Sequence, residues 1–175
     1  NLRSLKIEEL LERDELVSEI NKLTKNFKDS VILITGAGGS IGSEICRQII
    51  SINAKRLIML DNCENNLYQI NLEAGKIAKS NIELIPILGN ACDSYFIESL
   101  LKQYKVDIVY HAAAYKHVPL VEANPIQGIE NNVFSTISIC NASRKAKIKK
   151  FILVSTDKSV RPTNIMGASK RLAEL

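Results

Sequence analysis

Short aliphatic runs alternate with stretches of helical spacing along most of the chain. Residues 31–35 are almost continuously aliphatic, which is typical of a strand buried on both faces of a sheet. Apolar runs of this kind predict strands at 31–35, 56–60, 82–88, 107–111 and 151–155. Apolar residues spaced three and four apart predict helices at 40–50, 65–79, 94–104, 124–147 and 165–175.

The regular alternation of strand and helix predicts the α/β class, with a parallel sheet covered by helices on both faces. Because crossovers between parallel strands are right-handed, few topologies remain. We expect a doubly wound parallel sheet, the Rossmann fold, with strand order 3-2-1-4-5. A dinucleotide would lie across the carboxyl ends of its strands.

The first thirty residues follow a different pattern. Their apolar residues recur at roughly helical spacing between charged ones: Ile7, Leu10, Leu11, Val17, Ile20, Leu23 and Phe27. We therefore divide the chain into a helical leader at 1–30 and a dinucleotide-binding domain at 31–175. Two interpretations of the leader remain open: a helix packed on the domain, or a lid or partner-binding segment.

Composition narrows the possible partners. With 46% apolar and 24% charged residues, the chain resembles an ordinary globular domain of its length. Much of its net charge of +4 comes from a basic cluster: Arg144, Lys145, Lys147, Lys149 and Lys150. This cluster lacks the interleaved aromatic residues of a single-strand binder. We interpret it as a solvated helix end and expect no nucleic-acid partner.

The cysteines and the ends of the chain suggest where the protein is located and whether it is part of a longer one. The four cysteines form no C-x-x-C pair, so we expect reduced thiols, a cytoplasmic location and no metal site. The sequence contains no run of about 18 apolar residues and no signal peptide. Because residue 1 is not methionine, we expect the chain to be a piece of a longer protein.

The turn after the first predicted strand carries a phosphate-binding signal. Of Gly36, Gly39 and Gly42, one permits the tight turn, one lets backbone approach a pyrophosphate, and one lets the helix pack close to the sheet. Ser40 and Ile41 open the following helix, whose amide end attracts phosphate. The signal has meaning because it lies between a strand and a helix.

Asp61 strengthens this interpretation. It ends the second strand, 19 residues after Gly42, where a carboxylate bonds the ribose diol of a dinucleotide. We also expect Asn62 to contact the cofactor. No arginine follows at 62–64 to receive a 2′-phosphate, so the sequence favours NAD over NADP. Asp93 follows the third strand, where two roles remain open: contact with the adenine edge, or an N-cap of the next helix.

Five segments of the sequence belong together, and the first contains the glycine turn: residues 35–42, 111–119, 131–133, 155–158 and 161–171. The most specific are Lys116-His117-Val118-Pro119 and Thr156-Asp157-Lys158. Together these segments resemble the extended short-chain dehydrogenase/reductase superfamily, and within it the UDP-N-acetylglucosamine 4,6-dehydratases of bacterial glycan and capsule synthesis. Met166 stands where many such sugar enzymes carry a tyrosine base, which points to the methionine-bearing branch.

The resemblance, which covers almost the whole chain, implies that NAD is a bound cofactor and that the substrate is a UDP-sugar. It implies that Ala112 and Ala113 lie along the cofactor, and that the enzyme forms a homo-oligomer through the helices at 124–147 and after 165. The parent protein is implied to be membrane-anchored, with its active site on the cytoplasmic face. A C-terminal substrate region is implied to be absent, so we expect this chain to bind NAD with little or no turnover.

The implied reaction removes water from the sugar without net oxidation. We assign Lys158 as the base at C5, Asp157 as the acid at C6, and Lys170 as the ligand of the nicotinamide ribose. Thr156 is expected to hydrogen-bond the 4-hydroxyl. Because the thioether of Met166 cannot accept a proton, we expect Asp157 to take the 4-hydroxyl proton. These roles require a lowered pKa for Lys158 and a raised pKa for Asp157.

Three residues are candidates for the substrate side. Lys116 meets either the sugar or a diphosphate. His117 contacts substrate or is purely structural. Asn132 orders the active-site backbone or a water, or is an ordinary helix amide. Asp157 and Lys158 also have an alternative, as a surface ion pair after a strand.

Two residues depart from the family pattern, and other functions remain open. Asn90 stands where aspartate is expected and Ser135 where glycine is common. A nucleotide-sugar epimerase or an inverting, 5-epimerising dehydratase is one alternative, although an epimerase would keep a tyrosine at position 166. A non-catalytic NAD-binding or assembly module is another, and it would bind NAD without converting UDP-N-acetylglucosamine.

Overall fold

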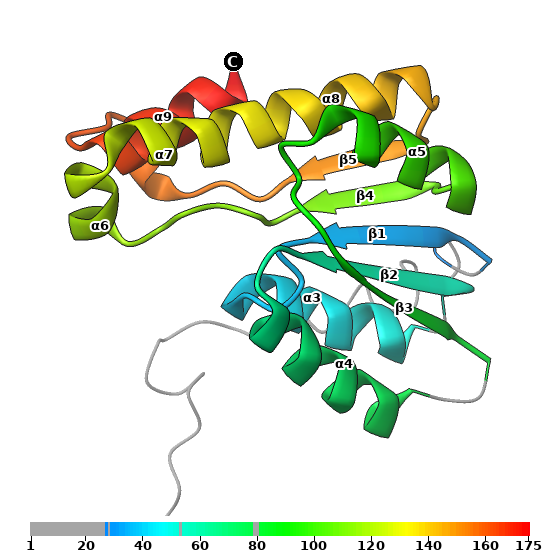
Figure 1. The fold of residues 1–175 in the computed structure, drawn as a ribbon. Coiled ribbons are helices and arrows are strands. Elements are labelled where there is room, and N and C mark those ends of the chain that lie inside the picture. Colours follow the sequence, from blue (N-terminus) through cyan, green and yellow to red (C-terminus); the bar gives the residue numbers. More distant parts are fainter. Residues whose placement is uncertain (1–26, 28, 53, 79–80) are drawn as a thin grey trace, which may run out of the picture.

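A computed structural model describes residue 27 and residues 29–52, 54–78 and 81–175, and at its centre lies a five-stranded parallel sheet (Figure 1). The strand order is β3-β2-β1-β4-β5, which confirms the predicted doubly wound α/β fold. The strands are β1 Val31–Thr35, β2 Arg56–Asp61, β3 Glu83–Leu88, β4 Ile108–His111 and β5 Lys150–Leu153. All four neighbouring pairs run parallel, so every strand ends at the same edge of the sheet.

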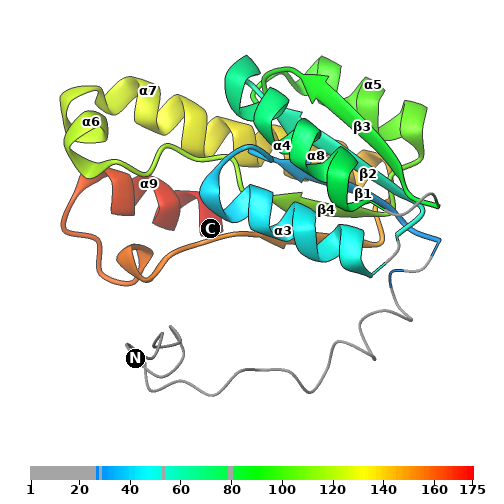
Figure 2. The ribbon, with the colours of Figure 1, turned by 90° about the horizontal axis from the view of Figure 1, so that it is seen from below.

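Helices cover both faces of this sheet. One face carries α3, Ser40–Ser51, and α4, Glu64–Ile77, while the other carries α5, Ser94–Tyr104, and α8, Ser135–Lys145 (Figures 1 and 2). Three further helices, α6 Val118–Ala123, α7 Pro125–Ile129 and α9 Ile165–Glu174, lie beyond the carboxyl ends of β4 and β5. These three helices therefore project beyond the carboxyl edge of the sheet.

β1 shows how the sequence produces the two layers. Ile32 and Ile34 pack into the cluster beneath α3 and α4, whereas Val31 and Leu33 pack into the cluster beneath α5 and α8. All five residues of this strand are buried. Burial on both faces favours aliphatic residues, which explains the run at 31–34, and the one polar residue, Thr35, bonds His111 at the carboxyl end of the strand.

The prediction of one α-helix at 124–147 is wrong in its middle. The helical backbone continues through this region, but the turn η2, Glu130–Phe134, is a π-helix between α7 and α8. The Ser135 hydroxyl donates to the Asn131 carbonyl, and the Thr136 hydroxyl donates to the Asn132 carbonyl at 2.8 Å. Such side-chain bonds compete with the backbone ladder and widen the turn.

Smaller differences occur elsewhere. The helix α6 and the 3₁₀ turn η3, Asp157–Ser159, are not predicted from the sequence, and β5 ends two residues earlier than expected. The predicted leader lies outside the described residues except at its end, where Phe27 is buried against the α3–α4 side of the sheet. Among the described helices, none has the length and apolar character needed to cross a bilayer.

The central position of β1 predicts a large cost for truncating it. Leu33→Ala removes a completely buried side chain, so we expect the free energy of unfolding to fall by about 2–5 kcal/mol in urea denaturation. The control is Tyr95→Ala on α5, where the side chain is 83% exposed and the change should stay within about 0.5 kcal/mol. Equal losses in the two variants would contradict this account of the core.

Candidate functional site

A cleft runs along the carboxyl edge of the sheet, across the turn that joins β1 to α3. It consists of two adjoining hollows of about 250 and 300 Å³. Both hollows are lined by Gly36, Gly39, Ala112, Ala114 and Tyr115. The first hollow extends to the end of β2, and the second extends over the start of α3 toward β5 and α9.

The glycine turn exists because two backbones approach closely here. Gly36 has φ +65°, and a Cβ atom on it would lie 2.7 Å from the Ala113 Cα. A Cβ atom on Gly42 would lie 2.0 Å from the Gly36 carbonyl oxygen. Gly39 is the N-cap of α3 and offers no side-chain cap, so the first amides of this helix, at Ser40, Ile41 and Gly42, are free to bind an anion in the cleft.

Asp61 lies at the far end of the first hollow, together with Asn62. Its side chain is buried and accepts two backbone hydrogen bonds of 2.9 Å, from the amides of Gly38 and Cys63. These bonds fix the carboxylate against the glycine turn. Because a carboxylate has about four acceptor positions, it retains capacity for two ligand hydroxyls.

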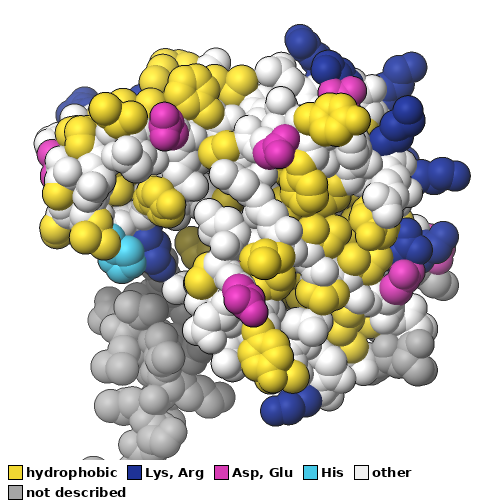
Figure 3. Space-filling model, in the orientation of Figure 1, with side chains coloured by type: hydrophobic (Ala, Val, Ile, Leu, Met, Phe, Trp, Pro, Cys, Tyr) yellow, Lys and Arg dark blue, Asp and Glu magenta, His cyan; other side chains and the backbone are white. Residues whose placement is uncertain are grey.

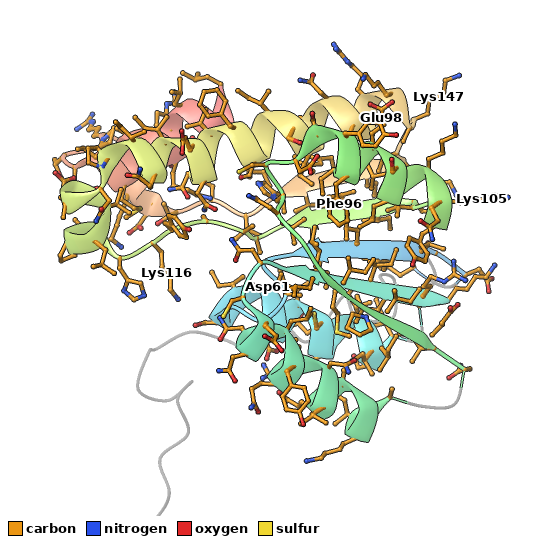
Figure 4. The ribbon with its side chains drawn as sticks, viewed as in Figure 1. Asp61, Phe96, Glu98, Lys105, Lys116 and Lys147 are labelled. Carbon is orange, nitrogen blue, oxygen red and sulfur yellow. The ribbon has the colours of Figure 1, made fainter. Side chains whose placement is uncertain are left out.

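The second hollow has the opposite charge character. Lys116, Lys158 and Lys170 line it, and no acidic residue does so in the described part of the chain. The Lys116 ammonium donates to the Ser40 hydroxyl at 3.1 Å, so this side chain crosses to the start of α3. Figure 4 shows Lys116 on the same edge of the sheet as Asp61. Of its two predicted roles, this position favours contact with a diphosphate.

Lys170 is held inside this hollow. Its ammonium donates to the Val154 carbonyl at 2.8 Å, and only 8% of the residue is exposed. Burial lowers the pKa of Lys170, and Glu174 on the next turn partly opposes that effect. One turn before Lys170, the thioether of Met166 is buried in the lining of the same hollow. Nothing at position 166 can therefore act as a proton acceptor.

The Thr156–Lys158 segment is brought to this hollow, but not all of it faces inward. Thr156 and Lys158 line the hollow, whereas the Asp157 side chain is 92% exposed. The Thr156 hydroxyl donates to Asp157 at 3.0 Å, and the Lys158 ammonium lies 3.8 Å from the same carboxylate oxygen. The Thr156 hydroxyl and then Lys158 lower the pKa of Asp157, which is opposite to the shift expected from the sequence.

Asn132 lies behind the cleft rather than in it. Its side chain is 2% exposed, receives the Tyr115 amide at 2.7 Å and donates to the Tyr115 carbonyl at 3.1 Å. It also donates to the Ser169 hydroxyl at 2.9 Å. Asn132, which lies in the π turn, therefore ties the segment after β4 to α9. This geometry agrees with the backbone-ordering role and not with direct substrate contact.

Two other candidates do not line the cleft. Asp93 is the N-cap of α5 and receives the Phe96 amide at 2.9 Å, so the structure favours its capping role over contact with adenine. His117 precedes α6 and lines a third hollow of about 390 Å³, which adjoins the second hollow of the cleft through Ala114, Tyr115 and Lys116. Ala112 lines both hollows of the cleft, and Ala113 lines the first.

Sequence reasoning missed the part played by His111. This residue ends β4, is 1% exposed, and bonds the Thr35 hydroxyl at 2.7 Å through Nδ1 and the Thr136 hydroxyl at 3.1 Å through Nε2. It thereby joins the ends of β1 and β4 to α8 beneath the cleft. Burial, with a smaller contribution from Lys170, lowers the pKa of His111 to about 4. A single polar residue at the end of an aliphatic strand was the available signal.

The basic cluster at 144–150 lies at the opposite edge of the sheet. Figure 3 shows lysines and arginines gathered there, and Figure 4 labels Lys147 beside Lys105 and Glu98. Lys145 pairs with Glu98 at 2.7 Å, and Lys149 pairs with Asp107 at 2.8 Å. The cluster therefore takes no part in the cleft.

Comparison with known proteins adds to this geometry. The sequence profile of a family described as polysaccharide biosynthesis protein matches residues 32–175. The chain is 40% identical over 175 residues to the capsular polysaccharide biosynthesis protein CapD of Staphylococcus aureus, and 39% identical over 174 residues to the probable polysaccharide biosynthesis protein EpsC of Bacillus subtilis. These matches cover 100% and 99% of this chain, and 29% of each relative.

A solved structure shares the fold. The UDP-glucose-4-epimerase of Stenotrophomonas maltophila, with bound NAD and formylated UDP-arabinopyranose, aligns with a TM-score of 0.74 at 20% identity. The alignment covers 83% of this chain and 46% of that one. At this identity the likeness establishes the doubly wound fold and nothing finer.

The buried His111 predicts a pH dependence of stability. Its folded pKa lies below the unfolded value of 6.5, so its contribution is complete above pH 6.5 and is lost as the pH falls toward 4. We expect urea unfolding to report a loss of up to roughly 3 kcal/mol over that range, which His111→Gln should largely abolish. Replacing the exposed His117 by glutamine is the control. An unchanged slope in His111→Gln would contradict the assignment.

Proposed function

We propose that this chain, which belongs to the polysaccharide biosynthesis protein family, is the NAD-binding part of a nucleotide-sugar 4,6-dehydratase. The proposed reaction converts UDP-N-acetylglucosamine to a UDP-4-keto-6-deoxy sugar for surface glycan synthesis. The observation that carries the proposal is the lining of the second hollow. A buried thioether, Met166, lines this hollow together with Thr156, Lys158 and Lys170, and the family resemblance implies an oxidation base at position 166 in many related sugar enzymes.

The residues of the cleft fit NAD. The close backbone approach at Gly36 and Gly42 leaves a cradle free of side chains beside the first turn of α3, where a pyrophosphate is favoured. Lys116 lies over the same turn and adds positive charge. Asp61 has free acceptor positions for a ribose diol and would repel a 2′-phosphate. That a solved epimerase of the same fold holds NAD supports this assignment.

Lys170 and Lys158 have separate tasks in the proposed reaction. When bound, NAD would accept hydride from C4 of the sugar and later return it to C6. Lys170, which burial makes easier to deprotonate, adds a donor to the nicotinamide ribose from inside the hollow. Lys158 removes the C5 proton, made acidic by the new 4-ketone, and gives a proton back to C5 at the end. The hydroxyl group at C6 leaves as water.

In this proposal Thr156 connects the exposed carboxylate of Asp157 with the sugar in the second hollow. Its hydroxyl lines the hollow and donates to Asp157, so a proton from the sugar 4-hydroxyl passes through Thr156 to that carboxylate. Asp157 then protonates the departing C6 hydroxyl. A carboxylate that is 92% exposed is a poor acid, and desolvation by the bound sugar would have to raise the pKa of Asp157. The chain spans 29% of the relatives' length, so residues elsewhere in such proteins can cover this face.

Recognition of the cofactor can be tested at Asp61. We expect the wild-type chain to bind NAD more tightly than NADP in calorimetry, because the carboxylate accepts the ribose diol. Asp61→Asn keeps the shape but not the charge, so it should lower NAD affinity about tenfold and raise NADP affinity, because the charge that repels the 2′-phosphate is removed. Asp93→Asn, which alters a carboxylate outside the cleft, is the matched control. Equal affinity of the wild-type chain for both cofactors would refute this role of Asp61.

The reaction itself can be tested by product analysis of the protein at its full natural length. With UDP-N-acetylglucosamine we expect a product lighter by one water, with a 4-ketone and a 6-methyl group in NMR spectra. Asp157→Asn should lower kcat at least roughly 100-fold, because one proton carrier is lost.

Three outcomes would count against the proposal. NAD binding without any product would support a non-catalytic module, and a change of configuration at C4 without loss of water would support an epimerase. A large rate gain in Met166→Tyr would mean that a conventional base serves this site better, so that Asp157 does not take the 4-hydroxyl proton. We expect Met166→Tyr to give no such gain.

A further inference from the structure

Two serines bracket the Thr156–Lys158 segment, and both are held by the same carboxylate. Ser155 precedes the segment and Ser159 follows it. Both hydroxyls donate to Oε1 of Glu174 on α9, with a distance of 2.7 Å from Ser159. Glu174 lies one helical turn after Lys170 and does not itself line the cleft in the described part of the chain. The Glu174 carboxylate, which lies outside the cleft, therefore holds both ends of a segment whose Thr156 and Lys158 line the second hollow.

Other contacts make this grip part of a larger unit. The Lys170 ammonium bonds the Val154 carbonyl at 2.8 Å, just before the segment. A Cβ atom on Gly167 would lie 2.5 Å from the Lys158 carbonyl oxygen, so α9 packs directly on the backbone of the segment. The Ser159 hydroxyl also lies 2.7 Å from the Thr156 carbonyl, so its one proton is shared between that carbonyl, which closes the turn, and Glu174. The segment at 154–160 thus rests along three successive turns of α9.

We propose that Glu174 is a positioning residue, which holds Thr156 and Lys158 in register with Lys170 by accepting hydrogen bonds from Ser155 and Ser159. The segment is otherwise weakly held. β5 ends at Leu153, and the Asp157 and Lys158 side chains are mostly exposed. Loss of Glu174 would leave the segment held to α9 by the Lys170–Val154 bond and by backbone packing at Gly167, with neither flanking serine fixed to the helix.

The carboxylate is suited to this task because it is charged at all working pH values. Donation by Ser155, then by Ser159 and Arg171, lowers the pKa of Glu174 to about 2. The Arg171 guanidinium contacts the other oxygen, Oε2, at 3.1 Å from the solvent side. Oε1 therefore accepts hydrogen bonds from the two serines, and Oε2 contacts Arg171 at the surface. Charge-assisted hydrogen bonds of this kind are stronger than neutral ones and hold their geometry better.

The inference rests on the proposed dehydration, and its test has one readout that does not. In the protein at its full natural length, Glu174→Ala should lower kcat roughly 100-fold with KM and NAD affinity little changed, because misplacing reacting groups by about 1 Å has that effect. Amide hydrogen exchange of residues 154–160, followed by mass spectrometry, should become about tenfold faster while exchange in β1 and β4 stays the same.

Matched variants separate positioning from general stability. Glu174→Gln retains an acceptor oxygen and should restore much of kcat and of the exchange protection, which also covers the case that Glu174→Ala does not fold. Arg171→Ala removes only the outward contact and should have little effect. The pair Ser155→Ala and Ser159→Ala should reproduce the Glu174→Ala loss, and adding Glu174→Ala to that pair should cost nothing more.

The outcomes distinguish this inference from the proposed function. If the wild-type protein shows no turnover, the dehydration is wrong and exchange at 154–160 alone decides the role of Glu174. If turnover is present while Glu174→Ala leaves kcat and local exchange unchanged, the positioning role is overturned. Faster exchange spread over the whole chain would also overturn it, because that result indicates a general loss of stability.

Discussion

The close approach of two backbone segments at the carboxyl edge of the sheet determines most of what this molecule can bind. The turn after β1 passes so near the segment after β4 that a Cβ atom at Gly36 would lie 2.7 Å from the Ala113 Cα. β1 is flanked by β2 and β4, so the chain leaves β1 and β4 toward opposite faces of the sheet. Beyond this point the segments that follow β1 and β4 diverge. The bond of His111 to Thr35 holds the ends of the two strands together beneath the cleft. The cleft is the result of that divergence.

Charge divides the cleft into two unlike halves. Asp61, anchored by two backbone amides, is the one acidic residue among the described lining of the first hollow. Lys116, Lys158 and Lys170 give the second hollow three cations without an acid among its described lining residues. Between them lie the free amides at the start of α3. This order suits a ligand with hydroxyl groups at one end and phosphates in the middle, with the reacting end beyond them, and it arises from residues far apart in sequence.

The strands and the glycine turn were predictable because their causes are local. Burial on both faces forces a continuous aliphatic run such as 31–34, and close backbone approach forces glycine at 36 and 42. The π turn was not predictable, because it depends on hydroxyl bonds from Ser135 and Thr136 that compete with the helix ladder. The environment of Asp157 was also beyond sequence, because its pKa depends on which side of a short turn its side chain leaves.

In the proposed reaction the groups that carry protons lie on a turn, because position 166 of α9 is a methionine. Met166 and Lys170 are successive inward positions of α9, and only Lys170 can carry a proton. The remaining candidates, Thr156, Asp157 and Lys158, lie on a short 3₁₀ turn and its N-cap, which are less rigid supports than a helix. A site of this kind needs an external brace, since proton transfer depends on fractions of an ångström. The packing of α9 along the turn, through Gly167 and Glu174, supplies such a brace from the helix that also carries Met166 and Lys170.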